Sequence, residues 1–246
     1  PRHHRGAGVS ALRGAVVAIA GAGGGAGPAV ARRLAQAGAV VAVADADAAK
    51  ASVVADDVRA HGGTAVAIAV DLLDTGATQA WASDLLARHG RVDGLVHLVG
   101  GWRGGSPLAT ADLAEWEALE PPLVRTVQRT SQAFHDALLA APAGRFVLVS
   151  SREATRPGQT NAAYAAAKAA AETWTLALAD AFDASSAAAS IIVVKALLTP
   201  AMREKRPDAG FDGYTDVADL AVQIADLWAV PSDEVNGQRI WMTELP

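Results

Sequence analysis

Residues 15–27, AVVAIAGAGGGAG, join a short apolar run to a cluster of glycines. The apolar run is typical of a buried strand, and the glycines predict a tight turn into a helix over residues 25–36. Bare glycine backbone lets a pyrophosphate approach, with its charge facing the helix N-terminus. A glycine-rich turn by itself can be only a flexible loop, so the setting between a strand and a helix carries the prediction.

The same alternation continues along the chain. Apolar or β-branched runs recur at residues 15–20, 40–44, 64–70, 94–98, 145–150, 190–194 and 238–242. Helical patterns lie at residues 25–36, 48–61, 77–88, 110–139, 162–182 and 216–228. This order predicts a doubly wound, mostly parallel α/β sheet of seven strands with helices on both faces. Right-handed crossovers would leave the carboxyl ends of the strands on one edge, where ligands should bind.

Two prolines interrupt the fourth helical pattern. Pro121 and Pro122 lie near the middle of residues 110–139. Proline lacks a backbone N–H and clashes with the preceding turn, so we expect the helix to break or kink there.

The composition fits one globular domain over residues 11–246, with residues 1–10 expected to form a disordered tail. Hydrophobic residues make up 51% of the chain, and the net charge is −5. Without a basic excess we expect no nucleic-acid or membrane partner, and the run at 15–20 is too short to cross a bilayer. The chain has no cysteine, which excludes disulfides and thiolate metal sites and fits a cytoplasmic location; no metal is expected.

An acidic residue follows the second apolar run. Asp45 lies eighteen residues after Gly27, where a carboxylate can accept hydrogen bonds from both hydroxyls of an adenosine ribose. The same charge would repel a 2′-phosphate, and the glycine turn has no Lys or Arg to neutralise one. NAD(H) is therefore favoured over NADP(H), although a solvated aspartate at a strand end is the simpler alternative.

Three further residues have the chemistry of proton transfer to an alkoxide. Tyr164 and Lys168 lie four residues apart on one face of a helical pattern, and Ser151 lies thirteen residues before the tyrosine. A cation at about 4 Å and a dielectric of about 20 stabilises a phenolate by about 4 kcal/mol, so we expect Lys168 to lower the pKa of Tyr164. The serine hydroxyl would orient a substrate carbonyl. The tyrosine–lysine spacing also occurs on ordinary amphipathic helices, so the order of motifs along the chain supports the prediction.

These motifs resemble the short-chain dehydrogenase/reductase family, over about residues 13–242. The resemblance implies a single-domain Rossmann fold and a homodimer or homotetramer. It implies a catalytic set of Ser151, Tyr164 and Lys168, with Lys168 also binding the nicotinamide ribose. The implied cofactor contacts are Gly21, Gly25 and Gly27 of the turn, then Asp45, Asp71 beside the adenine, Gly100, Lys168 and Thr199 near the carboxamide.

The sequence departs from the family pattern in two places. Leu123 stands where many members have an asparagine in a proton relay, and Lys195-Ala196 replaces a Pro-Gly pair, with an expected deletion. Either change puts turnover in question. The loop at residues 100–105, GGWRGG, is similar to that of dihydropteridine reductases.

The expected activity is reversible hydride transfer between a nicotinamide and a small-molecule carbonyl or secondary alcohol. A dinucleotide-binding protein with a regulatory or non-redox role, and a dihydropteridine-reductase-like enzyme, remain alternatives. Residues 201–214 suit a flap over the substrate or an ordinary exposed loop. By location alone, five side chains could line the substrate pocket: His97, Trp102, Arg152, Met202 and Phe211.

Overall fold

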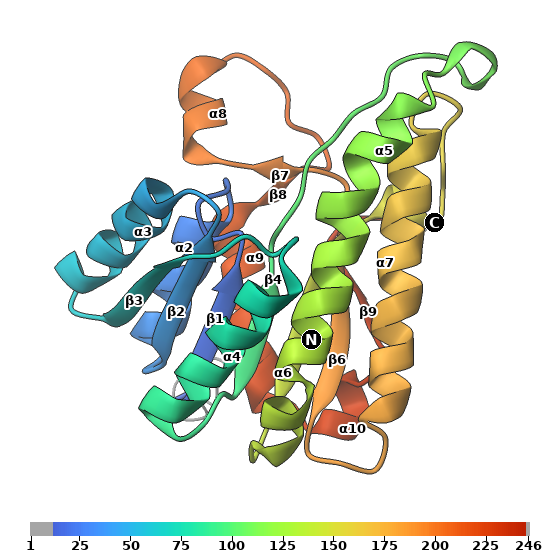
Figure 1. The fold of residues 1–246 in the computed structure, drawn as a ribbon. Helices are drawn as coiled ribbons and strands as arrows, with labels where there is room; N and C mark the ends of the chain where they lie inside the picture. The colour runs from blue at the N-terminus through green and yellow to red at the C-terminus, as the bar shows by residue number, and fades with distance from the viewer. Residues whose placement is uncertain (1–11, 245–246) are drawn as a thin grey trace.

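A single parallel sheet forms the centre of the molecule in the computed structural model, which describes residues 12–244 (Figure 1). Its strand order is β3-β2-β1-β4-β5-β6-β9, and every neighbouring pair is parallel. The strands are β1 (Val16–Ala20), β2 (Val40–Asp45), β3 (Thr64–Ala69), β4 (Gly94–His97), β5 (Arg145–Ser151), β6 (Ala188–Val194) and β9 (Arg239–Trp241). The predicted seven-stranded, doubly wound fold is confirmed. The predicted tail at residues 1–10 lies outside the described residues.

Helices cover both faces of this sheet and bury its apolar strands. One face carries α2 (Gly27–Gln36), α3 (Ala48–Ala60) and α9 (Val217–Asp226); the other carries α4 (Thr75–His89), α6 (Thr126–Ala140) and α7 (Ala162–Ala181). Alternate residues of β4 show the division, since Val96 faces the first layer and Leu95 the second. Complete burial of such side chains stabilises the fold by about 1.5–3 kcal/mol each.

The two prolines do not end the long helix. Pro121 keeps helical dihedrals of φ −58° and ψ −54°, and α5 (Ala114–Glu120) continues through a π-helical turn, η2 (Pro121–Arg125), into α6. The continuous helix formed by α5, η2 and α6 lies beside α7 (Figure 1). The N–H of Thr126 reaches back five residues to the Pro121 carbonyl, so the missing proline donors are accommodated by widening one turn. The helix also begins at Ala114 and not at residue 110, after a short 3-10 turn η1 (Leu108–Thr110).

Several short elements were not predicted, because they are too brief to show periodicity. The segment predicted as a flap or an exposed loop contains most of α8 (Pro200–Lys205). It is flanked by β7 (Leu197–Leu198) and β8 (Thr215–Asp216), which pair in parallel. The remaining short turns are η3 (Arg152–Ala154), η4 (Leu227–Ala229) and α10 (Ser232–Val235). None of the described helices combines the length and the hydropathy that crossing a bilayer requires.

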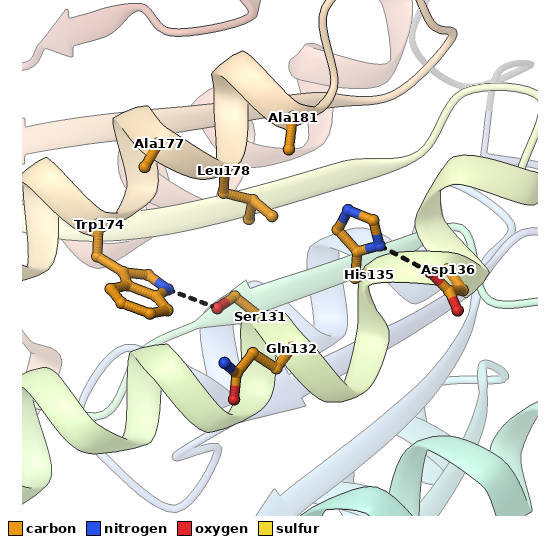
Figure 2. Close-up of a pocket in the computed structure, with 8 residues that line it drawn as sticks. All are labelled: Ser131, Gln132, His135, Asp136, Trp174, Ala177, Leu178 and Ala181. Atoms are coloured by element: carbon orange, nitrogen blue, oxygen red, sulfur yellow. Dashed lines mark hydrogen bonds and ion pairs between the residues drawn. The ribbon is translucent and has the colours of Figure 1, made fainter.

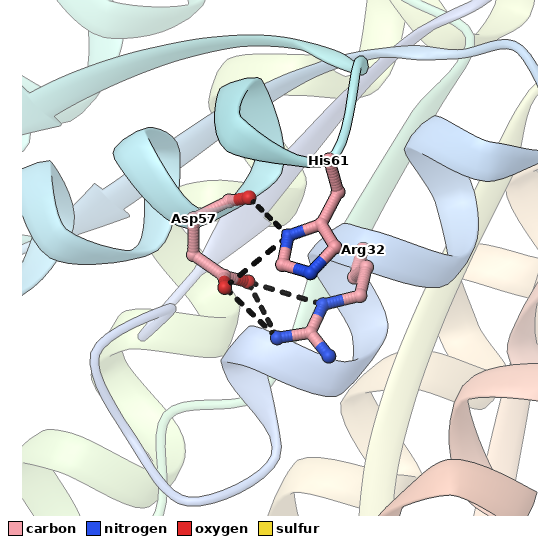
Figure 3. A network of polar contacts seen from close by, with 3 residues as sticks. All are labelled: Arg32, Asp57 and His61. Atoms are coloured by element: carbon pink, nitrogen blue, oxygen red, sulfur yellow. Dashed lines mark hydrogen bonds and ion pairs between the residues drawn. The ribbon is translucent and has the colours of Figure 1, made fainter.

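An ion-pair network joins α2 to α3 at the surface (Figure 3). Arg32 Nη2 lies 2.7 Å from Asp57 Oδ2, and His61 Nδ1 lies 2.8 Å from the Asp57 carbonyl oxygen. The side chains of Arg32 and His61 are 41% and 51% exposed. Exposed pairs of this kind contribute about 0–1 kcal/mol, so burial of the strands dominates the stability of this layer.

Substitution of Gly27 tests the close packing between the glycine turn and α2. A Cβ at Gly27 would lie 1.7 Å from the Ala22 carbonyl oxygen, whereas one at Gly101 would meet nothing within 4 Å. We expect Gly27→Ala to lower the free energy of unfolding by about 2–3 kcal/mol and Gly101→Ala by less than about 0.5 kcal/mol in urea titrations. Equal stability of the two variants would contradict the close-packing argument.

Candidate active site

The glycine turn connects β1 to α2 at the carboxyl edge of the sheet. Gly21 has a φ of +76°, and a Cβ there would lie 2.8 Å from the Val99 nitrogen. The N–H of Gly21 donates to the Ala44 carbonyl at 2.9 Å, which ties the turn to β2. A side chain would therefore meet both a strained conformation and a backbone clash, which explains why glycine occupies this position.

Asp45 ends β2 and faces this turn. Its Oδ2 accepts a hydrogen bond from the Gly23 N–H at 2.9 Å, and its Oδ1 accepts one from the Asp47 N–H at 3.0 Å. Both bonds hold the carboxylate in place, and each oxygen keeps a second lone pair for another donor. The half-buried carboxylate is thus oriented at the rim of the turn.

Two cavities lie along this edge. One, of about 210 Å³, is lined by Asp45, Asp71 and Val99 among other residues. The other, of about 320 Å³, is lined by Gly100, Trp102 and Val99 and by the three predicted catalytic side chains. Since Val99 lines both, the cavities are neighbours. The residues predicted to contact the adenosine and those predicted to be catalytic therefore lie along one stretch of the sheet edge.

Ser151 is the last residue of β5 and also caps η3. Its hydroxyl accepts a hydrogen bond from the Glu153 N–H at 3.3 Å, and the side chain is buried. The hydroxyl also lies close enough to Tyr164 to act on the pKa of the phenol. The end of the strand therefore presents this serine to the first turn of α7.

Tyr164 is partly buried in the first turn of α7. Burial raises its pKa, a hydrogen bond with Ser151 acts in the opposite direction, and the charge of Glu153 raises the pKa further. Since an ordinary tyrosine has a pKa of about 10, this phenol is protonated at neutral pH. It is therefore in the form that can donate a proton.

Lys168 lies one turn further along α7, but its ammonium is directed at the sheet. Its Nζ donates to the Val149 carbonyl at 3.0 Å. Burial lowers the pKa of Lys168 to about 8, and the carboxylate of Glu172 opposes that shift. The predicted lowering of the Tyr164 pKa by Lys168 is absent from this structure, because burial of the phenol dominates.

The five predicted substrate-contacting side chains do not all gather in one place. Trp102 lines the larger cavity and is 62% exposed. His97, in contrast, is completely buried behind it and does not line it. Arg152, Met202 and Phe211 are not among its lining residues either: Arg152 lies against Glu153, Met202 is in α8, and Phe211 packs against Tyr214.

Other predicted positions are explained by their packing. The hydroxyl of Thr199 caps α8 by accepting from the Met202 N–H, and its methyl group would lie 3.0 Å from a Cβ at Gly25. Thr199 is thus next to the glycine turn, and its contact with a dinucleotide stays a prediction. Leu123 is 1% exposed in an apolar cluster against which Tyr164 packs, so an apolar wall lies where relatives place an amide.

Sequence reasoning missed some residues at this edge. Ser150 and Lys195 line the larger cavity, and Glu172 lies buried next to Ser150, which donates to it at 2.6 Å. A signal for Glu172 was present, because it is the only acidic residue between positions 162 and 179 of an alanine-rich helix and lies two turns after Tyr164. Lys195 carried no such signal, since a lysine after a strand is ordinary.

A third hollow, of about 330 Å³, lies between α6 and α7 (Figure 2). Trp174 forms one wall and donates from Nε1 to Ser131 Oγ at 2.9 Å, while Ala177, Leu178 and Ala181 form the apolar side. None of its lining residues lines either cavity at the sheet edge. It is therefore separate from the predicted catalytic set.

The parallel sheet with a glycine turn at its carboxyl edge defines a Rossmann-type α/β protein. The sequence model described as short chain dehydrogenase matches residues 15–210, and the chain therefore belongs to this family.

Individual relatives agree with this assignment. The chain is 32% identical over 161 residues to a short chain dehydrogenase of Pseudocercospora fijiensis, covering 65% of this chain and 52% of that protein. It is 33% identical over 164 residues to the 2,3-dihydro-2,3-dihydroxybenzoate dehydrogenase of Bacillus subtilis, covering 67% and 62%. The matches thus span between about half and two thirds of the length of these curated relatives.

Two solved structures are also similar. A short chain dehydrogenase from Burkholderia cenocepacia, in complex with NADP, has a TM-score of 0.81 at 28% identity over 95% of this chain and 98% of that one. A gluconate 5-dehydrogenase from the same organism, with NADP and tartrate, has a TM-score of 0.82 at 26% identity over 96% of each chain.

The buried His97 predicts a pH dependence of stability. Burial lowers its pKa to about 3, so between pH 6.5 and 3 the unfolded chain binds a proton that the folded chain excludes. We expect the free energy of unfolding to fall by about 2 kcal/mol from pH 7 to pH 5 through this residue. His97→Gln should remove this loss in urea titrations, whereas His61→Gln, at an exposed site, should retain it; equal pH slopes would contradict the argument.

Proposed function

We propose that this protein is an oxidoreductase that binds NAD(H) in preference to NADP(H) and interconverts a small-molecule carbonyl and its secondary alcohol. The observation that carries the proposal is that Ser151, Tyr164 and Lys168 line one cavity at the carboxyl edge of the sheet. A chance Tyr-Lys spacing on a helix would not require a strand-end serine in the same cavity. Membership in the short chain dehydrogenase family supports the reaction class.

The residues present fit a nicotinamide dinucleotide. A Cβ at Gly23 would strike Lys50 and Asp45, and one at Gly25 would crowd Thr199, so glycine lets the turn pack closely before α2, where the N-terminal amides favour phosphate charge. Asp45 and Asp71 would hold the adenosine half in the smaller cavity, while Lys168 and Thr199 would hold the nicotinamide half. Two structural relatives contain NADP, so the preference for NAD(H) rests on the carboxylate of Asp45.

The proposed chemistry assigns one task to each side chain. When bound, the nicotinamide supplies a hydride to the carbonyl carbon or accepts one from the alcohol. Tyr164 donates its phenolic proton to the carbonyl oxygen as negative charge develops there, and Ser151 orients that oxygen by hydrogen bonding. Lys168 lines the same cavity and would hold the nicotinamide ribose. Stabilisation of the phenolate by its charge is outweighed here by burial of the phenol. Leu123 and its apolar neighbours exclude water from one side of the phenol.

A dihydropteridine-like substrate is a second candidate, supported by the position of the glycine-rich loop. Gly100, Gly101 and Trp102 line the same cavity as Tyr164, so the indole could cover a flat ring. A panel of ketones, quinones and quinonoid dihydropterins with NADH distinguishes the two candidates. Preferential turnover of the pterin favours the second, and cofactor binding without any turnover favours a regulatory or non-redox role.

We further propose that the chain forms a homodimer or homotetramer. The apolar hollow between α6 and α7 supports this, because Ala177 and Ala181 allow a second helix pair to approach closely (Figure 2). Trp174 would supply a large contact area at its edge. Sedimentation velocity of the purified protein tests the assembly, and a monomer at micromolar concentration would contradict it.

Tyr164→Phe tests the proton donor. Removing one hydroxyl should lower kcat by about 10²–10⁴-fold, because no donor remains for the developing alkoxide, while the Kd for NADH stays within about twofold. Steady-state kinetics and NADH fluorescence titration measure the two quantities. Tyr214→Phe, outside the cavity, serves as the matched control. Retention of wild-type kcat in Tyr164→Phe would eliminate the proposed role.

Asp45→Ala tests the cofactor preference. Losing the carboxylate removes two ribose hydrogen bonds and the repulsion of a 2′-phosphate, so the Kd for NADH should rise about tenfold or more and the NADPH/NADH preference should shift toward NADPH. Asp47→Ala, which alters an adjacent exposed carboxylate, is the control. An unchanged ratio of the two dissociation constants would show that the ribose is held elsewhere.

A further inference from the structure

Successive residues at the end of β5 each meet one face of α7. Tyr164, Lys168 and Glu172 are spaced four residues apart, so they share a face of the helix. The contacts are Ser151 with Tyr164, the Val149 carbonyl with Lys168, and Ser150 with Glu172. The first two involve the proposed catalytic set. The third does not, and the proposed reaction gives Glu172 no task.

Glu172 is a buried carboxylate with both oxygens engaged. It is 1% exposed; Ser150 Oγ donates to Oε1 at 2.6 Å, and Arg239 Nε on β9 donates to Oε2 at 2.7 Å. A carboxylate in such a place is strongly unfavourable unless it is paired and hydrogen-bonded. An apolar side chain would pack on this face without that cost. The group therefore has a use that depends on its charge or on its two directed bonds.

The charge of Glu172 acts on Lys168. Burial lowers the pKa of Lys168, and the Glu172 carboxylate on the same helix raises it, with a resulting value of about 8. The other titratable groups on this side are Tyr164 on α7, Glu153 in η3, whose charge acts on Tyr164, His97 on β4, which is neutral near pH 8, and Arg239, which faces Glu172. Of these groups, Glu172 is the anion that favours the charged form of the lysine.

We propose that Glu172 is a positioning residue that holds the end of β5 in register with α7 and keeps the buried Lys168 ammonium charged. The hydrogen bond to Ser150 fixes the residue directly before Ser151, and the carboxylate compensates the neighbouring cation. Arg239 donates a hydrogen bond to the carboxylate from the opposite side. The consequence for turnover rests on the proposed function, whereas the consequence for the charge of Lys168 does not.

Direct titration of Lys168 tests the electrostatic part without any cofactor. The chain has four lysines, so NMR of protein carrying lysine labelled with ¹³C at Cε gives few signals, and Lys168→Ala identifies the relevant one. We expect the wild-type signal to titrate near pH 8 and that of Glu172→Gln about one pH unit lower, because the anion is lost. Asp180→Asn removes an exposed carboxylate from the same helix and should leave the titration unchanged.

Two further variants separate charge from anchoring. Ser150→Ala removes the hydrogen bond to Glu172 without changing its charge, so the Lys168 titration should stay within about 0.3 pH units of wild type. Arg239→Gln removes a cation near the carboxylate, so the Lys168 midpoint should move to higher pH. This second variant also provides a reading if Glu172→Gln does not fold, which circular dichroism would reveal. A Lys168 midpoint that is the same in wild type and Glu172→Gln, or one that does not rise in Arg239→Gln, overturns the inference.

Turnover measurements test whether Glu172 holds β5 in register with α7. They also distinguish failure of this inference from failure of the proposed function. With any carbonyl that the wild type reduces, Ser150→Ala and Glu172→Gln should both lower kcat by about tenfold, with KM changed less than threefold. The alkaline limb of the pH profile should move to lower pH only in Glu172→Gln. Wild-type kcat in both variants overturns the register role. Failure of the wild type to bind NADH or NADPH would instead overturn the proposed function and leave the lysine titration interpretable.

Discussion

The contact between the carboxyl end of β5 and one face of α7 is the constraint on which the candidate site depends. Tyr164 and Lys168 are useful only where the strand presents Ser151 and the Val149 carbonyl to them. Polar groups in this interface are shielded from water, so an unmatched donor or acceptor would cost about 1–3 kcal/mol. A slip of the helix by one turn would unpair several of them together. The register is therefore strongly specified.

Burial in this interface sets the protonation of the two key groups in a consistent way. The same loss of hydration raises the pKa of Tyr164 and lowers that of Lys168, because each shift disfavours the charged form. The phenol is left protonated, and the ammonium is left close to losing its proton. The tyrosine–lysine pair by itself does not produce an acidic phenol here. The charge of Glu172 raises the pKa of Lys168 and so increases the fraction of the lysine that stays protonated.

The glycine turn at the carboxyl edge of the sheet owes its shape to backbone packing and not to side-chain contacts. Gly21 and Gly27 allow the chain to turn and pack where a Cβ would strike Val99 or Ala22. This turn also orients Asp45, because the Gly23 N–H donates to its carboxylate. A carboxylate held by two backbone donors would lose little further freedom on accepting the proposed hydrogen bonds from a ribose. The packing requirements of this turn thus agree with those of the proposed binding.

The sequence alone determined the strand and helix order, the glycine turn and the three residues of the proposed catalytic set, because each depends on local periodicity or short spacing. The tertiary structure decided what those patterns cannot express. It carried the helix through Pro121 with a π turn, buried His97 behind the cavity, directed Lys168 at a carbonyl, and placed Glu172 against Ser150. Each of these outcomes depends on which element packs on which, and long-range contacts of that kind leave no periodic signal in the chain.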